Sequence, residues 1–113
     1  MERDVKKFLT DISSAINEIE IFFENRPLRF DVYVRDICLK RAVERNITII
    51  GEAMNRVLKL NPSVNITSAR NIVDTRNYVI HGYDSVTDEI IWAIVVRHLP
   101  ILKAEVAQLL DNV

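Results

Sequence analysis

The sequence predicts an all-α protein, an antiparallel bundle of four main helices that forms a single domain over residues 1–113. Apolar residues recur at the spacing of one helical face through most of the chain. Only 2 glycines and 3 prolines are present to interrupt regular structure. A chain of this length buries about two thirds of its unfolded surface, so we also expect the domain to oligomerise.

The first helix is predicted over residues 2–24, and Pro27 ends the pattern because proline lacks an N–H donor and keeps the preceding residue out of the helical region. The second helix is expected over residues 31–60, with Asp31 as its N-cap. Its apolar stripe is wide and includes Cys38, which we assign to the core. A turn-rich segment, NPSVN, then ends this helix.

A shorter third helix is predicted over residues 68–80. The last helix is expected to begin at Ser85 or Thr87, because Ser85 and Asp88 have the spacing of a capping box. Its first half is apolar on nearly every side, so we place it at the centre of the bundle or in an oligomer interface. Pro100 is expected to kink this helix or split it in two.

Charge is nearly balanced, with 15 Lys plus Arg against 16 Asp plus Glu, so an anionic ligand must be held locally and not by a global basic field. The longest strongly apolar run, residues 90–96, is far shorter than the roughly 20 residues that span a bilayer. The charged start of the chain does not resemble a signal peptide, and a single cysteine allows no internal disulfide. We therefore expect a cytoplasmic protein that crosses no membrane.

The candidate chemistry lies in RNYVIHGY, residues 76–83. Arg76 is a permanent cation, His81 carries an imidazole, the side chain used most often for proton transfer near neutral pH, and Tyr83 is a phenol. Gly82 suits the left-handed position just past a helix end, so this motif straddles the C-terminus of the third helix. Such a set of groups suits the chemistry of phosphate esters.

The spacing of these residues limits how they can cooperate. At about 100° per residue, Arg76 lies about 140° round a helix from His81, whereas Asn77 and His81 are i,i+4 neighbours. One copy of the helix therefore aims Arg76 and His81 at one point only if the chain turns sharply at His81. The alternative is a two-fold dimer, in which an isologous interface places two copies of each residue around one groove.

In such a site Arg76 can donate two N–H groups to a phosphate and stabilise the charge of a pentacoordinate phosphorane. His81 can pass a proton to or from an RNA hydroxyl near pH 7. No metal is needed if the nucleophile is the 2′-hydroxyl of the RNA, and the product is then a cyclic phosphate. The sequence contains no recognisable metal-ligand set and no phosphate-binding or dinucleotide-binding loop, so we expect neither metal nor cofactor.

Each of these residues also has a purely structural interpretation. Arg76 and His81 can be cations near a helix C-terminus, where the helix dipole favours them by about 0.3–1 kcal/mol. Asn77 can make a local backbone bond, and Tyr83 can anchor the following loop. His98, in an apolar helix, is better explained as a packed histidine than as a ligand. Spacing alone leaves the function open.

The string R-N-x-x-x-H-x-Y, formed by Arg76, Asn77, His81 and Tyr83, resembles the R-x4-6-H signature of HEPN domains in the form found in HepT-like toxins. Residues 44–57, ERNITIIGEAMNRV, resemble the second helix of that family. The resemblance extends from the first helix to the last. It implies a HEPN-like helical homodimer that acts as a ribonuclease toxin and pairs with a minimal nucleotidyltransferase antitoxin.

The resemblance also implies roles for individual residues. Arg76 and His81 match the pair that acts on RNA in the dimer cleft, and Asn77 matches the polar position after the arginine. Tyr83 matches the tyrosine to which the antitoxin transfers AMP from ATP, which makes it a regulatory acceptor more than a catalyst. Each added nucleotide brings a phosphate that can occupy the Arg76 pocket and compete with RNA.

Two positions add detail to the resemblance. Many relatives carry a tryptophan shortly before the motif, whereas the only tryptophan here is Trp92, so the packing before the motif is expected to differ. Glu52 matches the acidic residue in the family's GEA string. Both a place near the cleft and a role as a surface carboxylate that holds an arginine are open for Glu52.

Several cations outside the motif are candidate RNA contacts, because affinity from phosphate contacts grows with the number of cations engaged. The candidates are Arg41, Arg45 and Arg70, with Arg35 and Lys40 nearby in sequence. Duplicated in a dimer, they can form a basic rim on a nearly neutral protein. A solvated helix face is an equally good interpretation of the same pattern.

Two functions of different classes follow. The first is a metal-independent endoribonuclease toxin that a nucleotidyltransferase inhibits. The second is a noncatalytic dimeric HEPN module that binds nucleotide or RNA and serves as the partner subunit of a nucleotidyltransferase. Replacement of Arg76 or His81 distinguishes them, because only an enzyme has turnover to lose.

Overall fold

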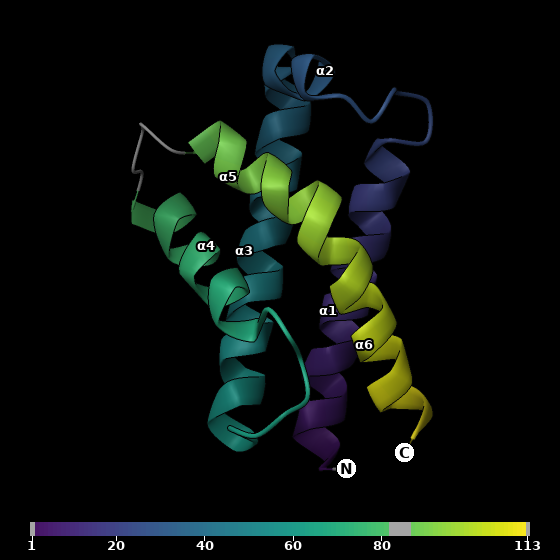
Figure 1. The fold of residues 1–113 in the computed structure, drawn as a ribbon, viewed down its shortest axis with the longest axis vertical. Coiled ribbons are helices and arrows are strands. Elements are labelled where there is room, and N and C mark those ends of the chain that lie inside the picture. The colour runs from purple at the N-terminus through teal and green to yellow at the C-terminus, as the bar shows by residue number, and fades with distance from the viewer. Residues whose placement is uncertain (1, 82–86, 113) are drawn as a thin grey trace.

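The structure of the protein is a computed structural model that describes residues 2–81 and 87–112, and all regular secondary structure in these residues is helical (Figure 1). The predicted all-α fold is therefore confirmed. The main helices alternate in direction along the long axis of the molecule, and the two chain ends lie at the same end of the bundle (Figure 1). In chain order the elements are α1 (Arg3–Phe22), α2 (Phe30–Arg35), α3 (Ile37–Leu60), α4 (Ala69–His81), α5 (Thr87–Ala93), the π-helix η1 (Ile94–His98) and α6 (Leu99–Asp111).

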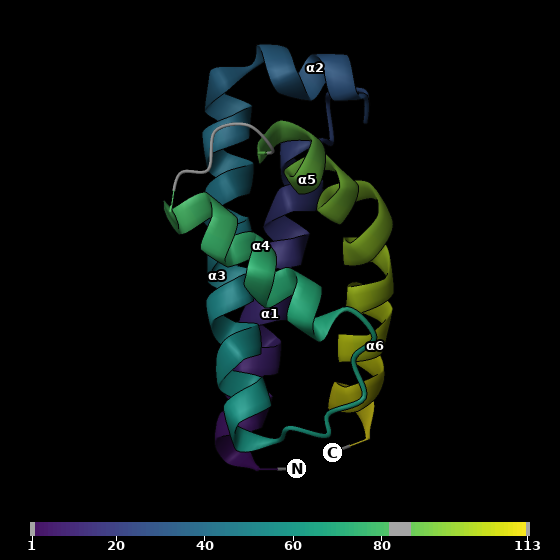
Figure 2. The same ribbon diagram turned by 60° about the vertical axis from the view of Figure 1, so that its left-hand side comes forward.

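The core lies between α1 and α3, with α6 packed along α1 and α4 crossing α3 (Figures 1 and 2). Both long helices contribute apolar residues at helical spacing, which is why each has one buried face. The largest fully buried side chains of these two helices are Leu9, Ile12, Ile16, Ile47, Ile50 and Met54. None of the described helices is both long and apolar enough to cross a membrane.

The prediction of one helix over residues 31–60 is wrong, because the chain breaks at Asp36 into α2 and α3. Asp36 has an extended backbone (φ −104°, ψ 98°), and its side chain accepts a hydrogen bond from the Leu39 N–H at 3.0 Å. It is thus the N-cap of α3, a position where aspartate satisfies one of the free donors of a helix start. Asp31 is not a cap: it lies in the first turn of α2, whose N-cap is Arg29.

The assignment of Cys38 to the core is also wrong, since Cys38 is exposed. Leu39 and Val43 carry the core face at the start of α3. Measured round the helix axis from Leu39, Cys38 lies about 100° away and Ile37 about 200° away. Ile37 is accordingly 65% exposed. The break at Asp36 lets α3 start with these two apolar residues turned away from the bundle.

The last predicted helix is split near Pro100, as expected. The Leu99 N–H donates to the Ile94 carbonyl five residues back, which makes η1 a π-turn between α5 and α6. A proline has no N–H, and its ring would clash with the carbonyl four residues before it in a regular helix. The wide turn just before Pro100 relieves this conflict without ending the helical path. Ser85, half of the predicted capping box, lies outside the described residues.

The tryptophan of the chain closes one end of the core. Trp92 stacks on Tyr33 with a centroid separation of 5.4 Å and meets the edges of Phe23 and Phe30 at 6.0 and 6.1 Å. These four rings come from α5, from α2 and from the end of α1. The cluster therefore anchors α2, which at six residues is too short to be stable alone.

A loop that packs on α6 leads into α4. The Thr67 N–H donates to the carboxylate of Glu105 at 3.1 Å, and Ser68 Oγ lies 3.0 Å from Nδ1 of His98. His98 is half-buried, which confirms its interpretation as a packed histidine. Both contacts fix the start of α4, which then crosses α3 (Figure 2).

Candidate functional site

Helix α4 carries the candidate site on its second half. Its inward face consists of Ala69, Ile72, Val73 and Thr75, which are buried. Arg76 follows directly and is half-buried, as is Asn77. Packing of the first half of α4 therefore determines where Arg76 is held.

The Arg76 guanidinium is oriented by its neighbour. Arg76 Nη1 donates to Asn77 Oδ1 at 2.6 Å, while Arg76 Nε is buried and has no hydrogen-bond partner among the described residues. A buried donor left without a partner costs about 1–3 kcal/mol, and more when the group is charged. The described neighbours of Arg76 thus leave part of its donor capacity unused, and the planar fork of a guanidinium matches the oxygens of a phosphate.

His81 occupies the last position of α4 and is exposed. The helix continues through this residue, so no sharp turn at His81 brings it back beneath Arg76. On a regular helix the two side chains point about 140° apart. Within one protomer the structure thus joins Arg76 to Asn77 and leaves His81 on another side of α4. Gly82 and Tyr83 lie outside the described residues.

Gly51 is a residue of this site to which the sequence analysis gave no role. It is buried in the middle of α3, where a Cβ would lie 2.3 Å from Arg76 Cβ. A signal was present in the sequence, because glycine inside a helix costs roughly 0.5–1 kcal/mol relative to alanine and so points to close packing. The identity of the packing partner, 25 positions along the chain, is visible only in the fold.

Comparison with known proteins gives the family. The model of the family described as Ribonuclease HepT-like matches residues 12–109. The chain belongs to the HepT-like ribonuclease family. The resemblance seen in the motif of Arg76 and His81 is thereby confirmed at the level of the family.

Individual relatives agree with this assignment. A Thermococcus cleftensis protein named "Probable ribonuclease HepT" is 32% identical over 113 residues, which cover 96% of this chain and 98% of that protein. Two Methanocaldococcus jannaschii proteins, each named "Putative RNase", are 31% and 29% identical and cover 93% and 99% of this chain. The matches cover 95% and 92% of those two proteins. No solved structure matches the chain.

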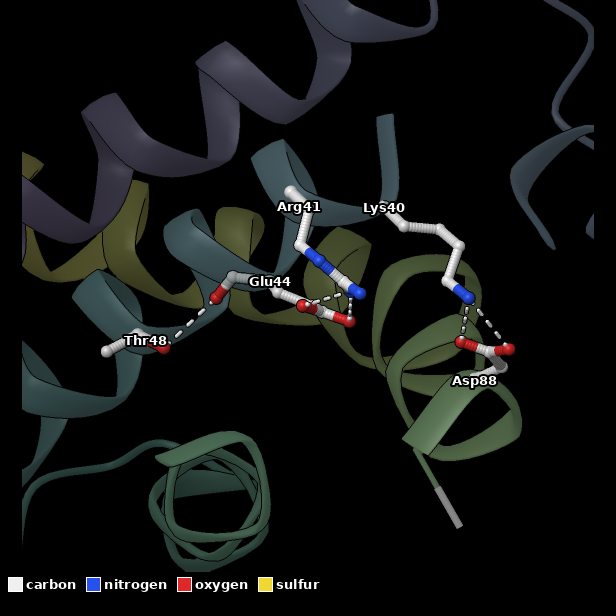
Figure 3. A network of polar contacts seen from close by, with 5 residues as sticks. All are labelled: Lys40, Arg41, Glu44, Thr48 and Asp88. Carbon is white, nitrogen blue, oxygen red and sulfur yellow. Dashed lines mark hydrogen bonds and ion pairs between the residues drawn. The ribbon is translucent and has the colours of Figure 1, made fainter. Parts of the chain in front are cut away.

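The candidate RNA contacts of this HepT-like protein differ in their surroundings. Arg41 is 65% exposed and pairs with Glu44 at 3.0 Å, and Arg45 and Arg70 are exposed. Lys40 is only 17% exposed and pairs with Asp88 of α5 at 3.1 Å. Figure 3 shows the Lys40 side chain extended toward α5 and the Arg41 side chain toward Glu44. The main contact of Lys40 therefore joins α3 to α5.

Glu52 of the GEA string lies on a different side of α3 from Gly51. It lines a hollow of about 390 Å³ between α1 and α3, together with Arg56, Asp11 and Glu18. This surrounding favours the interpretation of Glu52 as a surface carboxylate close to an arginine. Among residues 2–81 and 87–112, no group of three or more His, Cys, Asp or Glu side chains is arranged to hold a metal ion.

Proposed function

We propose that this HepT-like protein is a metal-independent endoribonuclease toxin of a toxin–antitoxin system, and that Arg76 and His81 cleave RNA in a dimer cleft. Membership of the ribonuclease family supports the reaction class. The observation that carries the residue assignment is Arg76 itself, a half-buried cation whose guanidinium is oriented by Asn77 on the helix that ends at His81.

The proposed reaction uses the RNA's own nucleophile. His81 removes the proton of a 2′-hydroxyl, the 2′-oxygen attacks the adjacent phosphorus, and the bond from phosphorus to the 5′-oxygen breaks. The leaving 5′-oxygen takes up a proton from water. Arg76 donates N–H groups to the nonbridging oxygens, where charge increases in the transition state. The products are a 2′,3′-cyclic phosphate and a 5′-hydroxyl.

A second copy of the chain completes the proposed site. Because Arg76 and His81 diverge on one α4, Arg76 of one protomer is proposed to work with His81 of its partner across a two-fold axis. Arg41, Arg45 and Arg70 are proposed to add phosphate contacts at the rim of the cleft. Each rim contact then strengthens RNA binding without contributing to the chemical step.

Regulation is proposed to act at Tyr83. A minimal nucleotidyltransferase antitoxin transfers AMP from ATP to the Tyr83 hydroxyl, and pyrophosphate leaves. The new phosphodiester carries a negative charge close in sequence to Arg76. It is proposed to occupy the anion site of Arg76 and so exclude the phosphates of RNA.

Cleavage of cellular RNA in excess EDTA tests the proposal. The unmodified protein, with the intact mass of free Tyr83, is compared with Arg76→Ala, His81→Ala and the control Arg97→Ala, a change at an exposed arginine of η1. We expect only the unmodified protein and the Arg97→Ala control to cleave the RNA. The fragments should carry cyclic phosphate ends. Folded, unmodified protein that cuts no RNA would point instead to a noncatalytic partner subunit of a nucleotidyltransferase.

A further inference from the structure

The closest approach between α3 and α4 lies at Gly51. A Cβ on Gly51 would lie 2.3 Å from Arg76 Cβ, 2.9 Å from Arg76 Cγ and 3.2 Å from the Ile72 carbonyl oxygen. Ile72 and Arg76 are one turn apart on α4, so the bare backbone of Gly51 faces a full turn of the neighbouring helix. The alkyl stem of Arg76 starts directly over this glycine.

The contact cannot be relieved by a rotamer change. Arg76 Cβ is bonded to the main chain, so its position is set by the backbone of α4, and the Ile72 oxygen is itself a backbone atom. A methyl group at residue 51 can therefore fit only if α4 moves away from α3 or turns about its own axis. Either movement displaces the whole Arg76 side chain, including the guanidinium that Asn77 orients.

We propose that Gly51 is a positioning residue for the RNA cleavage proposed above: its missing side chain sets the depth and direction of Arg76. The inference rests on that proposed function for its catalytic consequence, but the close contact stands on the geometry alone. Gly51 is not proposed to touch the RNA. It acts only through the place that it gives to Arg76.

The expected effect of Gly51→Ala on cleavage is large. Restoring an ordinary separation requires a shift of about 1 Å, and a misplacement of that size costs on the order of 100-fold in rate. Ala53→Ser is a matched control, because it adds one heavy atom to a buried small residue of α3 beside the hollow on the α1 side. The control is expected to cleave RNA at the wild-type rate.

A double-mutant cycle on RNA affinity distinguishes an effect on the position of Arg76 from a general loss of structure. The probe is an RNA oligonucleotide with 2′-O-methyl groups, which the protein can bind but not cleave, and its affinity is measured by fluorescence anisotropy. Gly51→Ala is expected to weaken binding clearly more when Arg76 is present than in the Arg76→Ala background, where α4 still shifts but no guanidinium is displaced. An equal loss of affinity in both backgrounds would show that Gly51 does not act through Arg76 and would overturn the proposal.

A stability cycle tests the contact without RNA. Arg76→Ala keeps the Cβ that Gly51 faces, whereas Arg76→Gly removes it. Gly51→Ala is therefore expected to lower the melting temperature more in the Arg76→Ala background than in the Arg76→Gly background. An equal change in both backgrounds would contradict the close approach.

The outcomes distinguish the two proposals. Wild-type protein that cleaves RNA, with Gly51→Ala equally active, overturns the positioning role and leaves the proposed function intact. Wild-type protein that neither binds nor cleaves RNA overturns the proposed function and the catalytic role of Gly51 together. In that case a positive stability cycle still establishes the α3–α4 contact.

Discussion

At the scale of single residues, two buried polar side chains contrast in how they are satisfied. Asn46 is 4% exposed, and its Nδ2 donates to the Ala15 carbonyl and to Glu18 Oε1, each at 3.0 Å. The Tyr33 hydroxyl is fully buried and has no hydrogen-bond partner among the described residues. Asn46 therefore joins α3 to α1. The Tyr33 hydroxyl, in contrast, loses its hydration on burial without a compensating hydrogen bond from the described residues.

We expect Asn46→Ala to lower the free energy of unfolding by about 1–3 kcal/mol, because both hydrogen bonds between α3 and α1 are lost. Urea unfolding followed by circular dichroism measures this change. Thr10→Ala is a suitable comparison: its exposed hydroxyl bonds only within α1, so its cost should be smaller. Equal costs for the two changes would show that the Asn46 contacts contribute little.

Tyr33 predicts a loss of stability in alkali. Burial raises the pKa of its phenol well above the usual value near 10, and the negative charges of Glu44 and Asp88 raise it further. Above pH 10 the unfolded chain therefore loses a proton that the folded chain keeps. The stability linked to Tyr33 is complete below about pH 10 and falls by about 1.4 kcal/mol per pH unit above it.

Urea unfolding between pH 9 and pH 11.5, values chosen to bracket the usual phenol pKa of about 10, tests this prediction. In Tyr33→Phe no phenol is present at this site, so the fall of stability with pH should be less steep than in the wild type. Parallel slopes for the two proteins would show that Tyr33 ionises equally easily in the folded and unfolded states.

At the scale of elements, the sequence predicted which segments are helical better than where they break. Apolar spacing identified α1, the body of α3, and α4 because each has a long buried face. The break at Asp36 interrupts the pattern for a single residue, so α2 and α3 read as one helix until the cap to Leu39 is seen. The misplacement of Cys38 has the same cause, since its exposure depends on where α3 starts.

In the candidate site too, the sequence identified some residues, whereas the roles of others are visible only in the fold. Arg76, Asn77 and His81 are close in sequence, so a motif could identify them. The role of Gly51 depends on packing between two helices and had only an indirect sequence signal, a glycine inside a long helix. Likewise, the sequence places Lys40 among the candidate RNA contacts, whereas in the fold it pairs with Asp88 of α5.

The Lys40–Asp88 pair is expected to stabilise the attachment of α5 to α3. Its side chains are 17% and 29% exposed, so the pair is less screened than a surface ion pair. We expect a coupling energy of about 1–2 kcal/mol, above the 0.2–1 kcal/mol typical of exposed pairs. A double-mutant cycle with Lys40→Met and Asp88→Asn, followed by urea unfolding, measures it.

The i,i+4 pair of Lys7 and Asp11 provides the comparison for that cycle. These side chains are 68% and 44% exposed, and a pair of this kind on a helix contributes about 0.3–0.5 kcal/mol. The difference between the two coupling energies should widen in high salt, because salt screens the exposed Lys7–Asp11 pair more strongly. Equal coupling energies for the two pairs would contradict a special role for Lys40.

At the scale of the whole molecule, the bundle leaves several large apolar side chains in water. The described examples are Ile21, Leu28, Phe30, Ile37, Leu60, Tyr78, Ile80 and Ile101, each more than a third exposed. Tyr78 and Ile80 lie between Arg76 and His81 on α4. We expect association through this part of α4 to cover apolar surface and to bring two copies of the candidate residues close together, which would link the oligomeric state to the site.

Mixed dimers test this link directly. If each site combines Arg76 of one protomer with His81 of the other, both Arg76→Ala and His81→Ala homodimers are inactive. A dimer with one protomer of each kind has one site without either residue and one intact site. After random exchange, half of the dimers are mixed, so the mixture should recover about a quarter of the wild-type cleavage rate.

The experiment mixes the two purified variants, allows the subunits to exchange, and follows cleavage of a labelled RNA over time. Activity that appears only after exchange requires a site shared between protomers, because neither variant supplies both side chains alone. A mixture that stays inactive although mass spectrometry detects mixed dimers would place Arg76 and His81 in the same protomer. Helix α4 would then have to unwind near His81 when RNA binds, since the two side chains point about 140° apart on a regular helix.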